Sequence, residues 1–187
     1  MHVMLDLETF GNGPDAAIIA LGAVQFDPAC LTLGDTFYRC VDLETSVRGG
    51  GEIDPGTVLW WLKQSDEARR AITDRAAHPL KRVLTEFAVW IRRDDGGEKT
   101  KVWGNGAAFD NVVLAQAYRR AHRPVPWPYW NDRCYRTLKN LLPEVQMERA
   151  GTHHNALDDA RYQARHLMEI LHRISINQRP PRGSEIT

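Results

Sequence analysis

The sequence predicts an α/β domain built on a mixed β-sheet. Three strand-like apolar runs come first, and helical periodicity then alternates with short strands. The length of 187 residues suits one domain with a full core, and we expect that domain to span residues 1–175. The remaining residues, 176–187, are polar and proline-rich and are expected to form a loose tail.

The first elements are apolar runs that are typical of strands. His2–Leu7 is a short apolar run, and Ala16–Phe26 is a longer one behind the turn-forming sequence GNGPD. With Thr36–Val41 they are typical of an antiparallel meander. Asp54-Pro55 then indicates a helix start, with Asp as N-cap and Pro in the first helical position. A second helix is predicted over Ser65–Ile72.

The later elements alternate between helices and strands. A third helix begins near Pro79, followed by a short strand over Lys101–Asn105 and a helix over Ala107–Ala121. A proline-rich connection leads to a short strand or helix start. Cys134–Leu142 is predicted to be helical, and the last helix runs from Asn155 to about Ile174.

Composition narrows the function classes. Hydrophobic residues make up 43% and charged residues 26%, which is ordinary for a globular protein. Basic and acidic residues balance at 24 each, whereas proteins that coat long duplex DNA carry a basic excess. A nucleic-acid contact is therefore expected to be short, at a strand end. The cysteines are few and scattered, and neither a membrane run nor a secretory signal is evident, so we expect a cytoplasmic protein.

The tetrapeptide Asp-Leu-Glu-Thr occurs twice, at residues 6–9 and 42–45. Two carboxylates spaced i, i+2 on a strand point to the same face and suit a divalent metal. Ligands gather at the carboxyl ends of the strands in such sheets, which favours Asp6 and Glu8 at the end of a central strand. Asp42 and Glu44 are expected at an exposed strand end that runs into a solvated loop.

Further candidates lie at the starts of helices. Asp110 follows a short strand, where a helix dipole placement is the simpler explanation for a single Asp. Asp159 lies in the first turns of the last helix, five residues after His154. Considered alone, His154 is most simply explained as a capping or surface residue at the start of this helix. Asp158 points elsewhere because adjacent helical residues diverge, and His153 is expected to be a bystander.

Three motifs together resemble those of the DEDDh (DnaQ-like) 3′–5′ exonucleases. They are Asp6-Leu7-Glu8, the stretch from Asn105 to Phe109-Asp110, and the stretch from His154 to Asp159. Longer stretches resemble a compact phage and bacterial subgroup of exonuclease VIII-like or 3′–5′ exoribonuclease proteins. The resemblance implies an RNase H-like fold, with a five-stranded mixed sheet flanked by helices on both faces. It also favours the first Asp-Leu-Glu-Thr copy, rather than the second, as the metal site.

The resemblance further implies a mechanism. Asp6, Glu8, Asp110 and Asp159 would hold two Mg²⁺ or Mn²⁺ ions, and His154 would be the general base. The substrate would be a single-stranded 3′ end, released as nucleoside 5′-monophosphates.

Substrate contacts are expected around the first two motifs. They are the Thr9 backbone at the terminal 3′-hydroxyl, Phe10 and Phe109 at terminal bases, and Asn105 within the second motif. One of Trp60 and Trp61 is expected in the core and the other, Trp61 by preference, in the cleft.

Alternatives remain open from the sequence. RNA is favoured by the subgroup resemblance, but no residue declares a contact to a 2′-hydroxyl, so DNA ends are the alternative. A non-catalytic nucleic-acid-binding module on the same fold is a further alternative, although the four acids and His154 are all present. The tryptophans and the apolar PVPWPYW segment suggest a homodimer.

Overall fold

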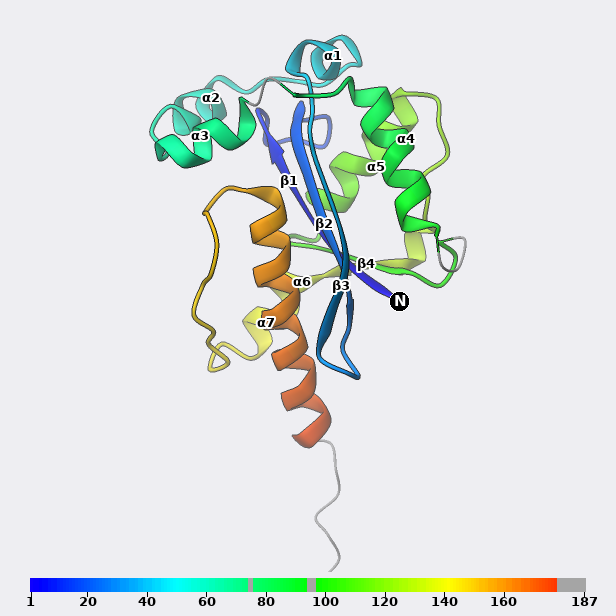
Figure 1. The fold of residues 1–187 in the computed structure, drawn as a ribbon, viewed down its shortest axis with the longest axis vertical. Helices are drawn as coiled ribbons and strands as arrows, with labels where there is room; N and C mark the ends of the chain where they lie inside the picture. The colour runs from blue at the N-terminus through cyan, green and yellow to red at the C-terminus, as the bar shows by residue number, and fades with distance from the viewer. Residues whose placement is uncertain (74–75, 94–96, 178–187) are drawn as a thin grey trace, which may run out of the picture.

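A five-stranded mixed sheet forms the centre of the computed structural model, which describes residues 1–73, 76–93 and 97–177 (Figure 1). The strand order is β3-β2-β1-β4-β5. The first three strands are antiparallel, while β4 pairs parallel to β1, and β5 pairs parallel to β4. The strands are β1 (His2–Thr9), β2 (Ile18–Asp27), β3 (Thr32–Cys40), β4 (Lys101–Gly104) and β5 (Asp132–Cys134).

Helices cover both faces of this sheet (Figure 1). α4 and α5 build one core against it, and α6 and α7 build a second core on the opposite face. The predicted architecture is therefore confirmed. The helices are α1 (Leu43–Arg48), α2 (Pro55–Trp61), α3 (Asp66–Ile72), α4 (Leu80–Ile91), α5 (Asp110–Arg120), the 3₁₀ turn η1 (Tyr129–Asn131), α6 (Tyr135–Leu141) and α7 (Ala156–Asn177).

The alternation of β1 determines where its acids point. Val3, Leu5 and Leu7 lie in the α4/α5 core, whereas Met4 packs in the α7 core. Side chains of a strand alternate between its faces, so Asp6 and Glu8 follow Met4 toward α7. The i, i+2 spacing thus aims both carboxylates at one helix.

The structure differs from the expected elements in local detail. Helix α1 occupies part of the expected solvated loop after the second tetrapeptide, because the Asp42 side chain caps it by accepting from the Thr45 amide at 2.8 Å. The last helix continues to Asn177, so the first two residues of the expected tail are helical, and 178–187 lie outside the described residues. In the described part of the chain, every helix is too short or too polar to cross a membrane.

Gly22 allows α7 to approach the sheet. A Cβ placed on this residue of β2 would lie 2.2 Å from the carbonyl carbon of Ala156, the first residue of α7. Ala156 and Ala160, the small residues on either side of Asp159 on α7, are fully buried.

Gly22→Ala is expected to lower the free energy of unfolding by about 1–3 kcal/mol or more, because backbone atoms must move to admit the methyl group. Thermal melting measures the loss. Gly13→Ala is the matched control, since a Cβ there meets nothing within 4 Å. A Gly22→Ala protein that melts with the wild type would contradict the close approach.

Candidate active site

Three buried carboxylates converge where β1 ends beside the start of α7. Oxygen atoms of Asp6, Glu8 and Asp159 all lie within 4.8 Å of one another. Each residue is less than a tenth exposed, and they come from two elements separated by about 150 positions in the sequence. The structure thus brings together acids of the first tetrapeptide and of the last helix, as the sequence led us to expect.

Individual hydrogen bonds orient this cluster. Gln163, one turn beyond Asp159 on α7, donates from Nε2 to Asp6 Oδ1 at 2.7 Å. The backbone amide of His154 donates to Asp159 Oδ2 at 3.2 Å. Glu8 Oε1 is buried and has no hydrogen-bond partner among the described residues. A buried, unsatisfied carboxylate oxygen is expensive, which makes this atom a natural metal ligand.

Asp110 lies beside the cluster with both of its oxygens accepting backbone amides. Leu7 N donates to Oδ1 at 3.2 Å and Asn105 N to Oδ2 at 2.7 Å. Gly104 makes this packing possible, because a Cβ there would lie 2.9 Å from Asp110 Cβ. The second motif therefore holds its acid against the end of β1.

Crowding and burial make the acids resist ionisation. Burial, followed by the charges of Asp110 and Glu8, raises the pKa of Asp6 well above its usual range. Burial and then Asp110 raise the pKa of Glu8 to about 8. Burial also raises the pKa of Asp110 to about 6, against the opposing effect of its backbone hydrogen bonds. A bound cation would relieve the repulsion that this arrangement concentrates.

His154 lies next to Asp159, on the segment that enters α7. Its backbone is left-handed, with φ of 61°, and its ring lies edge-on to Trp60, with centroids 4.8 Å apart. Burial, then the neighbouring His153 and Arg149, lowers the pKa of His154. The imidazole is therefore neutral, and able to accept a proton, at neutral pH.

Arg149 is a site residue that sequence reasoning missed. Its guanidinium forms an ion pair with Asp159 Oδ1 and lies over the Tyr162 ring, 5.1 Å from the centroid. It occurs in an irregular segment with no periodicity or motif, where the default interpretation of an arginine is a solvated charge. Only the folded chain shows that it meets an acid of the first turns of α7.

The expected substrate-contact residues surround this cluster unevenly. Phe10 and Phe109 are half-buried, and Asn105 accepts from Arg136 at 3.4 Å. Trp61 is only 3% exposed and donates from its indole to the Thr9 carbonyl at 2.8 Å. The preference for Trp61 as the cleft residue does not match this burial: Trp60, 43% exposed, presents the open ring beside His154. One turn of α2 cannot face both rings outward.

The second tetrapeptide lies outside this site. Asp42 caps α1, and Glu44 forms an exposed ion pair with Arg48 one turn along that helix. Both acids are thus accounted for by local helix structure.

The family comparison agrees with this geometry. A family model described as the 3′–5′ exoribonuclease Rv2179c-like domain matches residues 1–171. The chain belongs to this family. It is a 3′–5′ exonuclease, and the resemblance to 3′–5′ exonucleases drawn from the three motifs is confirmed.

Individual relatives of this exonuclease are named for, or were solved with, different nucleic acids or nucleotides. An exodeoxyribonuclease of Enterobacteria phage T4 is 27% identical over 161 residues, covering 74% of this chain and 70% of the phage protein. The nuclease domain of 3′hExo, a DEDDh family member solved with rAMP, shares the fold at a TM-score of 0.58 and 20% identity, covering 92% of each chain. Exonuclease X, solved with 5′ overhanging duplex DNA, shares the fold at a TM-score of 0.56 and 16% identity. The match covers 94% of this chain and 93% of exonuclease X.

Proposed function

We propose that this exonuclease removes nucleotides one at a time from the 3′ end of single-stranded RNA and releases nucleoside 5′-monophosphates. The observation that carries the proposal is the convergence of Asp6, Glu8 and Asp159 next to His154, whose backbone amide donates to Asp159. Such a site needs only a strand end threaded to it, which agrees with a net charge of zero.

The donor set fits divalent metal ions. Carboxylate oxygens are the ligands that Mg²⁺ and Mn²⁺ prefer, and Glu8 Oε1 lacks any other partner in the described part of the chain. Asp6, Glu8 and Asp159 would hold the ions, with Asp110 completing the set. When bound, two such ions stabilise both the attacking and the leaving oxygen of an in-line displacement at phosphorus.

The remaining work falls to the side chains. His154, neutral at neutral pH, removes a proton from the attacking water. Gln163 keeps Asp6 oriented, and the two amides on Asp110 prevent that acid from rotating.

Aromatic rings around the site suit the bases of a terminal nucleotide. Trp60 is exposed beside His154, and Phe10 is half-buried against Trp61 with centroids 6.4 Å apart. Stacking on such rings contributes about 1–3 kcal/mol per base and tolerates any sequence. Thr9, Asn105 and Phe109 stay proposed contacts of the terminal nucleotide, and Trp61 is proposed to act through the Thr9 backbone that it holds.

DNA ends are the second candidate substrate, favoured by the phage exodeoxyribonuclease relative. The family description favours RNA. Self-association stays a prediction, supported by the exposed rings of Tyr129 and Trp130, which are 77% and 65% exposed. A cytoplasmic location likewise stays a prediction.

The test uses two 5′-labelled single strands of matching sequence, one RNA and one DNA, incubated with Mn²⁺ and separated on a sequencing gel. We expect a ladder that shortens from the 3′ end, faster on RNA. Faster shortening of DNA would support the second candidate. Failure to shorten either strand, with folded protein and metal present, would refute the proposed activity on single strands.

A further inference from the structure

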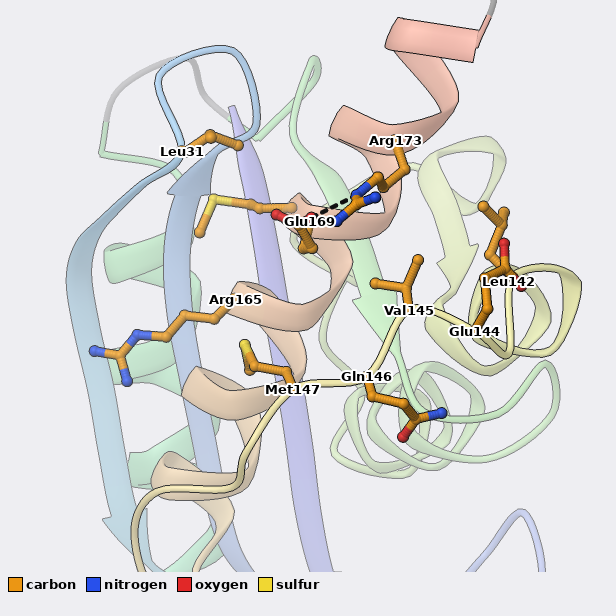
Figure 2. Close-up of a pocket in the computed structure, with 10 residues that line it drawn as sticks. Leu31, Leu142, Glu144, Val145, Gln146, Met147, Arg165, Glu169 and Arg173 are labelled. Carbon is orange, nitrogen blue, oxygen red and sulfur yellow. Dashed lines mark hydrogen bonds and ion pairs between the residues drawn. The ribbon is translucent and has the colours of Figure 1, made fainter.

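The segment between α6 and α7 lies along α7 like a strap. Three of its residues contact one face of the helix in antiparallel order: Val145 O accepts from His166 Nε2 at 2.7 Å, Met147 O accepts from Tyr162 Oη at 3.3 Å, and Arg149 pairs with Asp159. We call residues 145–149 the strap. Figure 2 shows its first part, around Val145 and Met147, running beside α7.

The spacing of these contacts is regular on both sides. The strap uses every second residue, as an extended chain does, and residues 146 and 148 between them are exposed. The helix uses positions 159, 162 and 166, which share one face. Two extended residues advance about 6.6 Å and one helical turn about 5.4 Å, so the two elements stay nearly in step. The register delivers Arg149 to the acidic cluster.

Arg149 is the cation that the buried cluster meets in the folded chain. It contacts Asp159 directly, and its positive charge favours the ionised forms of both Asp6 and Glu8. Its own hydrogen bonding is incomplete, since the buried Nε atom has no acceptor among the described residues. The guanidinium is held by charge and by the Tyr162 ring rather than by a saturated set of hydrogen bonds.

The strap borders a groove of about 650 Å³ whose lining includes Val145, Met147, Arg165 and Glu169 (Figure 2). Val145 is packed in the α7 core, so this end of the strap is anchored. The Arg149 end is the contact that a divalent ion at Asp159 would oppose, because like charges repel strongly at short range in a buried site.

We propose that Arg149 is an internal counter-ion that occupies the cluster while divalent metal is absent and leaves Asp159 when metal binds. The inference rests on the metal site proposed above. Metal binding and strap attachment are then competing uses of Asp159, and by linkage each weakens the other. The strap end becomes free as the site becomes competent.

The first test measures Mn²⁺ binding by calorimetry, and thermal melting with and without Mn²⁺, for the wild type and for Arg149→Gln. We expect Arg149→Gln to bind Mn²⁺ about tenfold more tightly, a typical coupling between two linked events. Without metal its Tm should fall below that of the wild type, because the acids lose their counter-ion.

Arg161→Gln is the matched control. Arg161 is an α7 arginine close to Asp159 in sequence, but it pairs at 3.9 Å with Asp158 rather than with the cluster. The substitution removes the same charge as Arg149→Gln, but from a more distant and partly screened position. We therefore expect its Mn²⁺ affinity to stay within about twofold of the wild type. Equal or weaker Mn²⁺ binding by Arg149→Gln, or an equal gain in Arg161→Gln, would overturn the inference.

A second measurement uses the wild type alone and covers the case in which Arg149→Gln does not fold. Amide hydrogen exchange across 147–152 should accelerate at saturating Mg²⁺, as the strap end is released. Unchanged or slower exchange there would overturn the proposal while leaving the metal site intact. If wild type and Arg161→Gln show no binding of Mn²⁺ at all, the proposed metal site itself fails, and this inference with it.

Discussion

Asp6→Asn is expected to lower kcat/KM in Mn²⁺ by about a thousandfold or more, because it removes a metal-ligating charge from the centre of the cluster. The fold should persist, since Asn keeps the shape of Asp and Gln163 can reorient to bond it. The duplicated tetrapeptide supplies the control. Asp42→Asn alters the equivalent residue of the second copy, and Asn is an equally good N-cap for α1. Its rate should stay within a few-fold of the wild type.

The same substitution is expected to stabilise the metal-free protein. Folding raises the pKa of Asp6. Above the ordinary pKa of a carboxyl group, the ionised side chain is therefore less stable in the native state than in the unfolded chain. Stability is therefore lost as pH rises, and Asp6→Asn removes that loss. We expect a gain of about 0.5–2 kcal/mol near neutral pH that disappears near pH 4. Thermal melts across pH, in chelator, measure it.

A loss of activity in Asp42→Asn with full activity in Asp6→Asn would reverse the assignment of the two copies.

The acids of this site were predictable because each belongs to a regular element with a period. Asp6 and Glu8 share a face of a strand, and Asp159 lies near the start of an amphipathic helix, so spacing alone indicates where each points. The order of the three motifs along the chain then supplied their convergence. The antiparallel meander and the alternation of helices with short strands followed from the same patterns, whereas the five strands and the two helical layers were implied by the family resemblance.

The features that sequence reasoning missed depend on contacts between distant residues. The Trp60–Trp61 choice is set by one hydrogen bond to Thr9, which lies on another element. Arg149 comes from a segment in which only Val145 and Met147 alternate with polar residues, too short a pattern to predict an element, and its partners become visible only with α7 in place. Helix α1 did have a local signal, Asp42 three residues before Thr45, but at six residues it is too short to show a period.

His154→Asn is expected to lower kcat by about a hundredfold to ten-thousandfold, the usual contribution of a positioned general base. Asn is the appropriate replacement because it tolerates the left-handed backbone at this position better than Ala does. The amide that donates to Asp159 is retained. Stabilisation by Mn²⁺ should therefore survive, since His154 is not one of the three residues whose ligand atoms cluster.

The pH profile separates a lost base from a disturbed site. At saturating Mn²⁺, where the bound ion keeps the carboxylates ionised, the acid limb set by His154 should lie below the ordinary pKa of an imidazole, because burial lowers the pKa of His154. That limb should be absent from the residual rate of His154→Asn. His153→Asn makes the same change at the exposed neighbouring histidine and should leave kcat within a few-fold. A fully active His154→Asn enzyme would show that another group takes the proton, whereas loss of Mn²⁺ stabilisation would make His154 a structural support for Asp159.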